Sequence, residues 1–169
     1  MIPGFGLDSC GSEFRWWGVQ KHLHWGERDA NKIADIMQSP RRVFACKGAF
    51  MMFRRSILNR VGGFLFYDHF KNYYEETDFC HRVNNAGYEC WFVPTPIIIH
   101  RCAATSGRFP KCEIWSQYIA NCLYSFYHNF GPFRKWLTII PFSLLACGRH
   151  PWCFVKGIKM LCCLGKSCR

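Results

Sequence analysis

Residues 73–87 read Tyr-Tyr-Glu-Glu-Thr-Asp-Phe-Cys-His-Arg-Val-Asn-Asn-Ala-Gly. The segment contains three carboxylates near its start: Glu75, Glu76 and Asp78. Negative charge is favoured at that position in a helix, because the N-terminus of a helix carries partial positive charge. The apolar residues that follow recur at helical spacing: Phe79, Val83 and Ala86. Gly87 is typical of the residue after a helix, so we predict a helix over residues 75–87.

The segments before this helix combine strand and helix patterns. Residues 43–53 form an apolar run around Gly48, which predicts a buried strand with a bulge or a close backbone approach at the glycine. Ser56 as N-cap and Gly62 as C-terminal stop predict a helix of two turns. A further short helix is expected near residues 29–37.

The segments after it continue the alternation. Residues 88–93 predict a strand, and residues 97–99 predict a short second strand that ends at His100. Residues 113–130 carry apolar side chains on one helical face. This mixture of strands and helices places the chain in the α/β class.

The order of these motifs resembles the C-terminal half of the catalytic domain of family-2 glycosyltransferases, in particular the rhamnosyltransferase-like branch. The residues that carry the resemblance are Gly48-Ala49, Arg54-Arg55, Val61-Gly62-Gly63-Phe64, Tyr74-Glu75-Glu76-Thr77-Asp78-Phe79, Arg82, Ala86-Gly87-Tyr88, Val93-Pro94 and His100. The resemblance implies a partial GT-A domain with a mixed sheet over residues 1–112. It also implies transfer of a sugar, with inversion, from a nucleotide-sugar donor to a glycan or lipid-linked acceptor in cell-surface polysaccharide synthesis.

The resemblance also assigns roles to residues. Glu76 would be the base that takes the proton of the acceptor hydroxyl, and Glu75 and Asp78 would orient it or contact acceptor hydroxyls. Substrate-binding residues would be Gly48, Ala49 and Arg82, and Arg82 would also brace the carboxylates by ion pairing. His100 would hold a divalent cation, Mg²⁺ or Mn²⁺, that stabilises the diphosphate leaving group.

Two features depart from the family pattern. Asp-x-Asp, the metal-binding motif of the family, is missing, since no two of the chain's aspartates are separated by one residue. The family has Gly-Phe-Asp-Glu after the Val-Gly, and here Leu65-Phe66 stand in place of its acidic pair. We therefore expect a truncated copy or the acceptor-side half of a split enzyme. The alternative is a non-catalytic remnant that binds an acceptor or a membrane and lacks the donor-nucleotide half.

Two of the assigned roles have ordinary structural alternatives. Three carboxylates in a first helical turn are common and stabilising without any catalytic role. A lone histidine at the end of a strand, such as His100, often only bonds to backbone.

The charge is distributed unevenly. The chain carries 22 basic and 11 acidic residues, a net charge of +11 at pH 7, and every residue after Glu113 is basic or uncharged. Residues 113–169 therefore predict an amphipathic basic helical tail. Its apolar run at 136–147 is shorter than the roughly 20 residues that a membrane crossing needs. Docking on an anionic membrane surface fits better than nucleic acid, so we expect a cytoplasmic protein, peripheral on the inner face of the membrane. The oligomeric state is left open.

The chain contains 12 cysteines, and no two have Cys-x-x-Cys spacing. That spacing is the signature of zinc ribbons and thioredoxin-like sites. No secretion signal is visible at the N-terminus, so we expect reduced, buried thiols, with a disulfide framework as the alternative.

Overall fold

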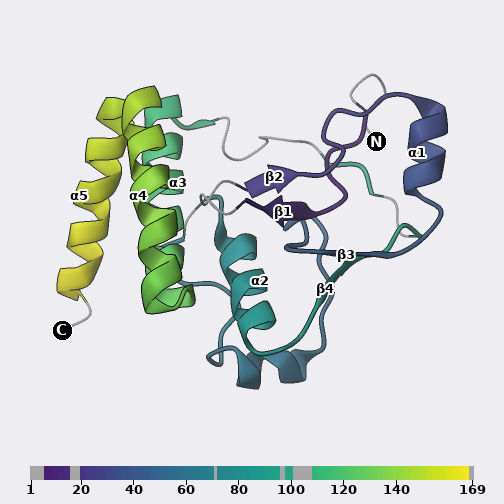
Figure 1. The fold of residues 1–169 in the computed structure, drawn as a ribbon, viewed down its shortest axis with the longest axis horizontal. Helices are drawn as coiled ribbons and strands as arrows, with labels where there is room; N and C mark the ends of the chain where they lie inside the picture. The colour runs from purple at the N-terminus through teal and green to yellow at the C-terminus, as the bar shows by residue number, and fades with distance from the viewer. Residues whose placement is uncertain (1–5, 16–19, 71, 96–97, 101–107, 168–169) are drawn as a thin grey trace. The chain divides into compact units, whose positions relative to one another are not determined.

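The computed structural model of this protein describes residues 6–15, 20–70, 72–95, 98–100 and 108–167 (Figure 1). Its elements are, in chain order, β1 Ser12–Phe14, β2 Gln20–His22, α1 Ala30–Ile36, β3 Arg41–Val43, the 3-10 helix η1 Arg55–Arg60, α2 Glu75–Asn85, β4 Cys90–Phe92, α3 Lys111–Asn129, α4 Pro132–Arg149 and α5 Pro151–Ser167. The described part of the chain is thus a mixed α/β structure with short strands and several helices.

The chain forms two compact units. The first, here called the sheet unit, holds the described residues of Met1–Phe14, Gln20–Leu65 and Phe79–Cys102. The second, the helical unit, holds the described residues of Arg15–Val19, Phe66–Asp78 and Ala103–Arg169. Each unit is described by itself below. Helix α2 contributes its first turn to the helical unit and its remaining turns to the sheet unit.

The sheet unit contains two antiparallel strand pairs. Strand β1 pairs with β2, and β3 pairs with β4 so that Val43 lies opposite Cys90. A bridge between Ser12 and Ala45 connects the two pairs. All pairings among the described strands are antiparallel, which differs from the mixed sheet expected from the sequence. The buried core of the unit comes from β3, β4, α2 and the residues that directly follow β3 and η1. It comprises Val43, Ala45, Val61, Phe79, Cys80, Val83 and Cys90.

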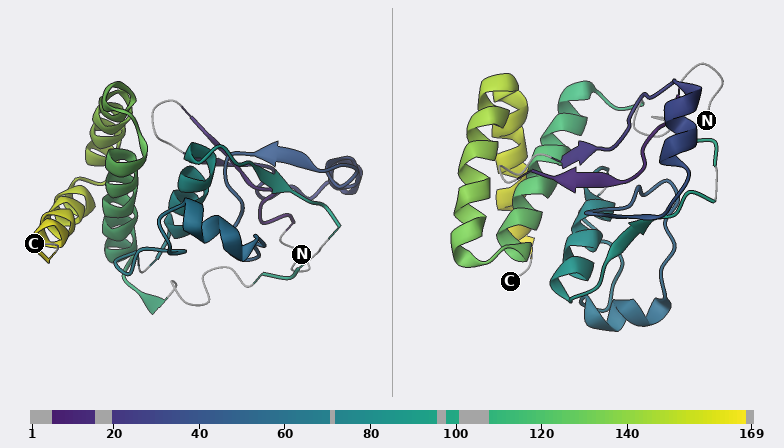
Figure 2. Two further views of the ribbon diagram at one scale, coloured as in Figure 1. Left: turned by 90° about the horizontal axis from the view of Figure 1, so that it is seen from below. Right: turned by 45° about the vertical axis from the view of Figure 1, so that its right-hand side comes forward.

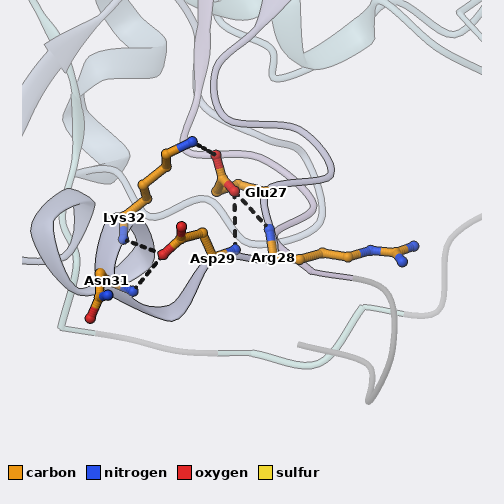
Figure 3. A network of polar contacts seen from close by, with 5 residues as sticks. All are labelled: Glu27, Arg28, Asp29, Asn31 and Lys32. Carbon is orange, nitrogen blue, oxygen red and sulfur yellow. Dashed lines mark hydrogen bonds and ion pairs between the residues drawn. The ribbon is translucent and has the colours of Figure 1, made fainter.

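Helix α1 begins where the sequence predicted, because Asp29 caps it. The Asp29 carboxylate accepts hydrogen bonds from the backbone N–H groups of Asn31 and Lys32, at 2.9 and 3.2 Å (Figure 3). Glu27 in turn accepts from the N–H groups of Arg28 and Asp29, at 3.0 and 3.1 Å. These bonds fix the loop before α1 and satisfy donors that a helix start leaves unpaired.

Helix α2 confirms the prediction made from residues 75–87. Phe79 and Val83 are buried, whereas Ala86 is exposed, so the apolar stripe ends one turn earlier than expected. Gly87 adopts φ +82°, a left-handed conformation that glycine takes without steric cost, and the Tyr88 N–H closes the helix on the Val83 carbonyl.

Three other predictions for the sheet unit were wrong in part. The strand expected over residues 43–53 is limited to Arg41–Val43, and Gly48 and Ala49 lie in a turn. The apolar run after Val43 leaves the strand for this turn, and several of its side chains line a cavity. The helix expected at Ser56 is a 3-10 helix with Arg54 as N-cap and no side-chain capping bond. Residues 98–100 are not in a strand, and Ile97 lies outside the described residues.

Helices α3, α4 and α5 form the body of the helical unit (Figure 2). Helix α3 covers the predicted range and buries Ile119, Cys122, Leu123 and Phe126. A glycine permits the close approach of α5 to α3, since a Cβ atom at Gly157 would lie 2.8 Å from the Ser116 carbonyl oxygen. Among the described residues, no helix combines the length and the apolar character that a membrane crossing requires.

Candidate functional site

The acidic first turn of α2 belongs to the helical unit. Glu75 and Glu76 are half-buried, and Asp78 is only 1% exposed. The Asp78 N–H donates to the Tyr74 carbonyl at 2.9 Å, so the chain enters the helix directly from the two tyrosines. The three carboxylates that the sequence analysis selected are therefore presented together by one helical turn.

The turn before α2 is strained. Tyr73 and Tyr74 have φ values of +61° and +74°, in the left-handed region that side chains with a Cβ atom seldom adopt. Such a residue costs on the order of 1–3 kcal/mol and persists only where the surroundings hold it, often at functional sites. Two consecutive residues of this kind directly precede Glu75 and Glu76, so the position of the carboxylates depends on what holds the turn.

Helix α3 holds this turn through hydrogen bonds. The Asn121 side-chain amide donates to the Asn72 and Tyr73 carbonyls, at 3.1 and 2.8 Å. One turn earlier on α3, Gln117 accepts from the Asn72 side chain at 3.2 Å. Asn121 is 2% exposed, so its bonds are shielded from competition with water.

The same face of α3 also contacts Asp78. Asn129 donates to Asp78 Oδ1 at 2.7 Å and to Ser125 Oγ at 3.0 Å. We call the four residues at successive four-residue spacing the polar face of α3: Gln117, Asn121, Ser125 and Asn129. Residues four apart lie on one side of a helix, so this face contacts the segment before α2 and the acidic turn itself.

Buried aromatic rings complete the surroundings of the turn. Tyr74 is 2% exposed and packs edge-on against Tyr118 and Phe126, with ring centroids 5.9 Å apart in both pairs. Burial raises the pKa of Tyr74 well above its usual range, and the nearby Cys122, Tyr118, Asp78 and Glu76 raise it further. Tyr74 therefore stays a neutral, packed residue and does not exchange protons near neutral pH.

The sheet unit contains a cavity of about 770 Å³. Most of its lining is apolar, contributed by residues such as Ile33, Met37, Phe50, Met51, Met52 and Phe92. An acidic side chain, two basic side chains and an imidazole also line it: Asp8, Arg28, Lys47 and His100. A mainly apolar cavity with a few polar groups is the usual form of a small-molecule site. The two cations suit an anionic ligand such as a phosphate ester.

His100 forms a close pair with Asp8 in this lining, with 2.8 Å between Nδ1 and the carboxylate oxygen. Carboxylates commonly orient metal-binding imidazoles in this way, through the nitrogen that does not face the metal. The pair therefore fits a role for His100 in cation binding. Within the described ranges, the one group of three potential ligands has only cysteines, so Asp8 and His100 would supply two ligands at most. Mg²⁺ is often held by few protein ligands together with phosphate oxygens and water.

The three predicted substrate-binding residues, Gly48, Ala49 and Arg82, do not share one environment. Ala49 lines the cavity, whereas Gly48 and Arg82 do not. The Arg82 guanidinium donates to the carbonyls of Val61, Phe64 and Leu65 in the sheet unit. It also lies over the Phe64 ring, 4.5 Å from the centroid. The contacts described thus give Arg82 a structural role in the turn that follows η1.

The comparison with protein families confirms the resemblance found in the sequence. The family model for glycosyl transferase family group 2 matches residues 15–165, which is most of the chain. The chain belongs to this family. No curated protein and no solved structure was found to match it. A family-2 glycosyltransferase transfers a sugar from a nucleotide-sugar donor to an acceptor.

The sequence reasoning missed two groups of residues in this glycosyltransferase. The polar face of α3 is one, although a signal existed: polar residues recur every four positions in an otherwise apolar helix. Asp8 and Lys47 in the cavity are the other. No local pattern selects them, because Asp8 and His100 are 92 residues apart and meet only through the fold.

Proposed function

We propose that this chain takes part in inverting transfer of a sugar from a nucleoside-diphosphate sugar to a glycan or lipid-linked acceptor, with Glu76 as the catalytic base. The observation that carries the proposal is the acidic first turn of α2. This turn contains the family motif, and the polar face of α3 holds it in place. Deprotonation of an acceptor hydroxyl needs a carboxylate in a fixed position. Glu75 would orient the acceptor beside it, and Asp78, which is buried and bonded to Asn129, would hold the turn in place.

The proposed donor site is the cavity of the sheet unit. Lys47 and Arg28 would contact the diphosphate by charge-assisted hydrogen bonds, and the apolar lining would receive the base of the nucleotide. His100, oriented by Asp8, would help to hold Mg²⁺ or Mn²⁺. When bound, that cation would neutralise charge on the diphosphate leaving group. The described residues support a partial GT-A domain as the fold behind this arrangement.

Release of nucleoside diphosphate from a panel of nucleotide sugars, with extracted glycolipid as acceptor, tests the role of Glu76. We expect Glu76→Gln to lower turnover by about 10²- to 10⁴-fold, the usual contribution of a general base. Glu113→Gln is the matched control, because Glu113 also lies in a helical first turn, that of α3. Equal activity of the two variants would refute the base assignment. Acceptor binding without turnover in the wild-type chain would instead favour the non-catalytic remnant.

Calorimetric titration with UDP and TDP, with and without Mn²⁺, tests the donor site separately. We expect Lys47→Ala to weaken nucleotide binding by about tenfold, since a charge-assisted contact contributes about 1.4 kcal/mol or more. Lys21→Ala is the control, because Lys21 is exposed on β2 and does not line the cavity. Unchanged binding in Lys47→Ala would place the nucleotide elsewhere.

We further propose that α4 and α5 dock on an anionic membrane surface, where a lipid-linked acceptor would be found. Large apolar side chains are exposed on these helices: Phe133, Trp136, Leu137, Ile140, Leu144, Leu145, Trp152 and Val155. Basic residues accompany them, among them Arg134, Arg149 and Lys156. An interfacial helix combines such a surface with basic charge.

Vesicle flotation tests this docking. The chain should float with vesicles that contain phosphatidylglycerol and much less with pure phosphatidylcholine. Trp136→Gln together with Leu144→Gln should weaken flotation, whereas exposed residues of the sheet unit, such as Trp25, should tolerate the same change. Equal flotation with both kinds of vesicle would count against an electrostatic contribution.

A further inference from the structure

Three cysteines from different parts of the sheet unit meet at one point. Cys46 follows β3, Cys80 lies in α2 and Cys90 begins β4. Their Sγ atoms all lie within 4.8 Å of one another. Cys80 and Cys90 are 1% and 6% exposed, and Cys46 is half-buried.

The fold brings these residues together without any short-range motif. The β3–β4 register places Cys90 opposite Val43, three residues before Cys46. Cys80 follows Phe79, which is part of the same core. Each cysteine thus comes from an element whose position is fixed by packing, so the three sulfurs are held in place by the core.

The separation of the sulfurs suits a metal ion. Zn²⁺ binds thiolates at about 2.3 Å in tetrahedral geometry, which puts two thiolate sulfurs on one zinc about 3.8 Å apart. The three Sγ–Sγ distances here are at most 4.8 Å. Small side-chain movements would bring them to the value of about 3.8 Å in a zinc site. Soft thiolate ligands favour zinc over the hard Mg²⁺ and Mn²⁺ ions.

We propose that Cys46, Cys80 and Cys90 form a zinc site with three thiolate ligands, whose fourth position opens toward the cavity of the sheet unit. Cys46 lines that cavity, which provides the entry path and room for a water molecule or another exogenous ligand. The site is separate from the Asp8–His100 pair and does not depend on the proposed transferase activity.

Groups around the sulfurs support this assignment. The Asn84 side chain donates to the Cys80 carbonyl at 2.7 Å and to the Phe44 carbonyl at 2.9 Å, which ties α2 to the segment leading to Cys46. Three thiolates and one Zn²⁺ carry a net negative charge. Arg42, whose charge acts on the Cys90 thiol, and Lys47, the neighbour of Cys46, offset that charge. Bound zinc would link β3, α2 and β4.

Titration of the reduced full chain with Co²⁺, a spectroscopic substitute for zinc, tests the proposal. We expect a thiolate-to-cobalt charge-transfer band that Zn²⁺ displaces. Cys46→Ser should weaken Zn²⁺ binding by about 100-fold or more, since even loss of an outer-shell partner costs 10- to 100-fold. Cys10→Ser is the matched control, because Cys10 is a buried thiol that lines the same cavity outside the cluster, and it should bind metal like the wild type. Absence of the band in the folded wild type, or an equal band in Cys46→Ser, would overturn the proposal.

A second measurement uses the wild-type chain alone and so does not depend on the folding of a variant. Alkylation followed by peptide mass spectrometry should show that Zn²⁺ protects Cys46, Cys80 and Cys90, while the exposed Cys147 reacts at the same rate with and without the metal. Labelling of Cys46, Cys80 and Cys90 that is the same with and without Zn²⁺ would overturn the proposal. A disulfide within the cluster in the reduced preparation, with no zinc retained, would do the same.

Discussion

The side-chain amide of Asn129 donates to Asp78 Oδ1 across 2.7 Å, and this bond connects the end of α3 to the acidic turn of α2. Asp78 is 1% exposed, so its carboxylate needs partners that replace water. Asn129 is held in turn by Ser125, and both belong to the polar face of α3. The same face, through Asn121, restrains the strained turn before Glu75. One helix face thus determines the geometry of the acidic turn.

Asn129→Asp should destabilise the protein strongly. It replaces a donor by a second carboxylate beside a buried one, and removing a partner from a buried charged group costs about 3 kcal/mol. Asn129→Ala should cost less, about 1–2 kcal/mol, because it removes the bond without adding repulsion. Urea unfolding at pH 7 and pH 4 measures both. The Asp variant should recover part of its loss at pH 4, where one carboxyl is protonated. Identical, pH-independent losses would show that Asp78 and Asn129 do not interact.

Asn121→Ala should release the turn formed by Asn72, Tyr73 and Tyr74. Two part-buried carbonyls lose their donor, which costs about 1–3 kcal/mol, and the left-handed residues lose their restraint. Amide hydrogen exchange should therefore become faster at residues 72–78. The free energy of unfolding of the whole protein should also fall. Asn31→Ala, at an exposed position of α1, serves as the control and should change neither quantity. Unchanged exchange at residues 72–78 would mean that packing alone holds the turn.

Local patterns predicted best the helices that have a clear capping residue at one end. Gly87 after α2 acts through its own backbone neighbours, and α2 lies where the sequence placed it. Helix α1 also lies in the expected range, and the structure adds its cap, Asp29. The prediction of a strand over residues 43–53 was wrong, because it rested on an apolar run alone. An apolar run shows that side chains avoid water, but it does not distinguish a strand from a turn that lines a cavity.

The partners of the candidate site residues could not be predicted, because they come from distant segments. Asn129 is 51 residues from Asp78, and His100 is 92 residues from Asp8. Such pairs depend on the tertiary fold, which a single sequence reveals only through a family resemblance. The resemblance identified the acidic turn, but the polar face of α3 required the structure.

Arg82→Lys should destabilise the sheet unit by about 2–3 kcal/mol. The guanidinium donates to three carbonyls in the segment Val61–Leu65, and a lysine ammonium cannot reproduce that planar arrangement. Arg42→Lys is the matched control: Arg42 is exposed and pairs with Glu89 at 3.1 Å, so this change should stay within about 0.5 kcal/mol. Denaturant unfolding compares the two. Equal effects would show that the buried contacts of Arg82 contribute no more than a surface ion pair.

Stability should fall as the pH drops below about 6.5, because of two histidines of the helical unit. His69 and His128 pack on Tyr124, with ring centroids 4.4 and 4.2 Å away. Burial lowers the pKa of both rings below the ordinary value of 6.5. Asp78 raises the pKa of both rings and so opposes the shift, as Asp68 does at His69. The charge of His128 lowers the pKa of His69 further, and the charge of Lys135 lowers that of His128.

The sign of this pH dependence follows from proton binding. The unfolded chain binds protons at these rings before the folded chain does, so stability declines between the unfolded and folded pKa values of each ring. Solvent screens the effect more at His128, which is exposed, than at the half-buried His69. Unfolding free energies measured between pH 7.5 and pH 5 should show this decline, and His69→Gln with His128→Gln should reduce the slope. A slope that is unchanged in the double variant would assign the decline to carboxylates.

Cys112 and Cys153 should form a disulfide when the chain is exposed to oxidised glutathione. Their Sγ atoms lie 2.8 Å apart, and the residues are 41 positions apart, at the starts of α3 and α5. Closing a loop of that length should stabilise the helical unit by about 4 kcal/mol in the chain-entropy model. Peptide mapping without reductant identifies the bond, and thermal unfolding with and without reductant measures its effect. Cys112→Ser should abolish the difference, whereas Cys147→Ser, at an exposed thiol of α4, should leave it unchanged. A crosslink that survives in Cys112→Ser, or one that lowers the unfolding temperature, would show that the two thiols do not meet in this geometry.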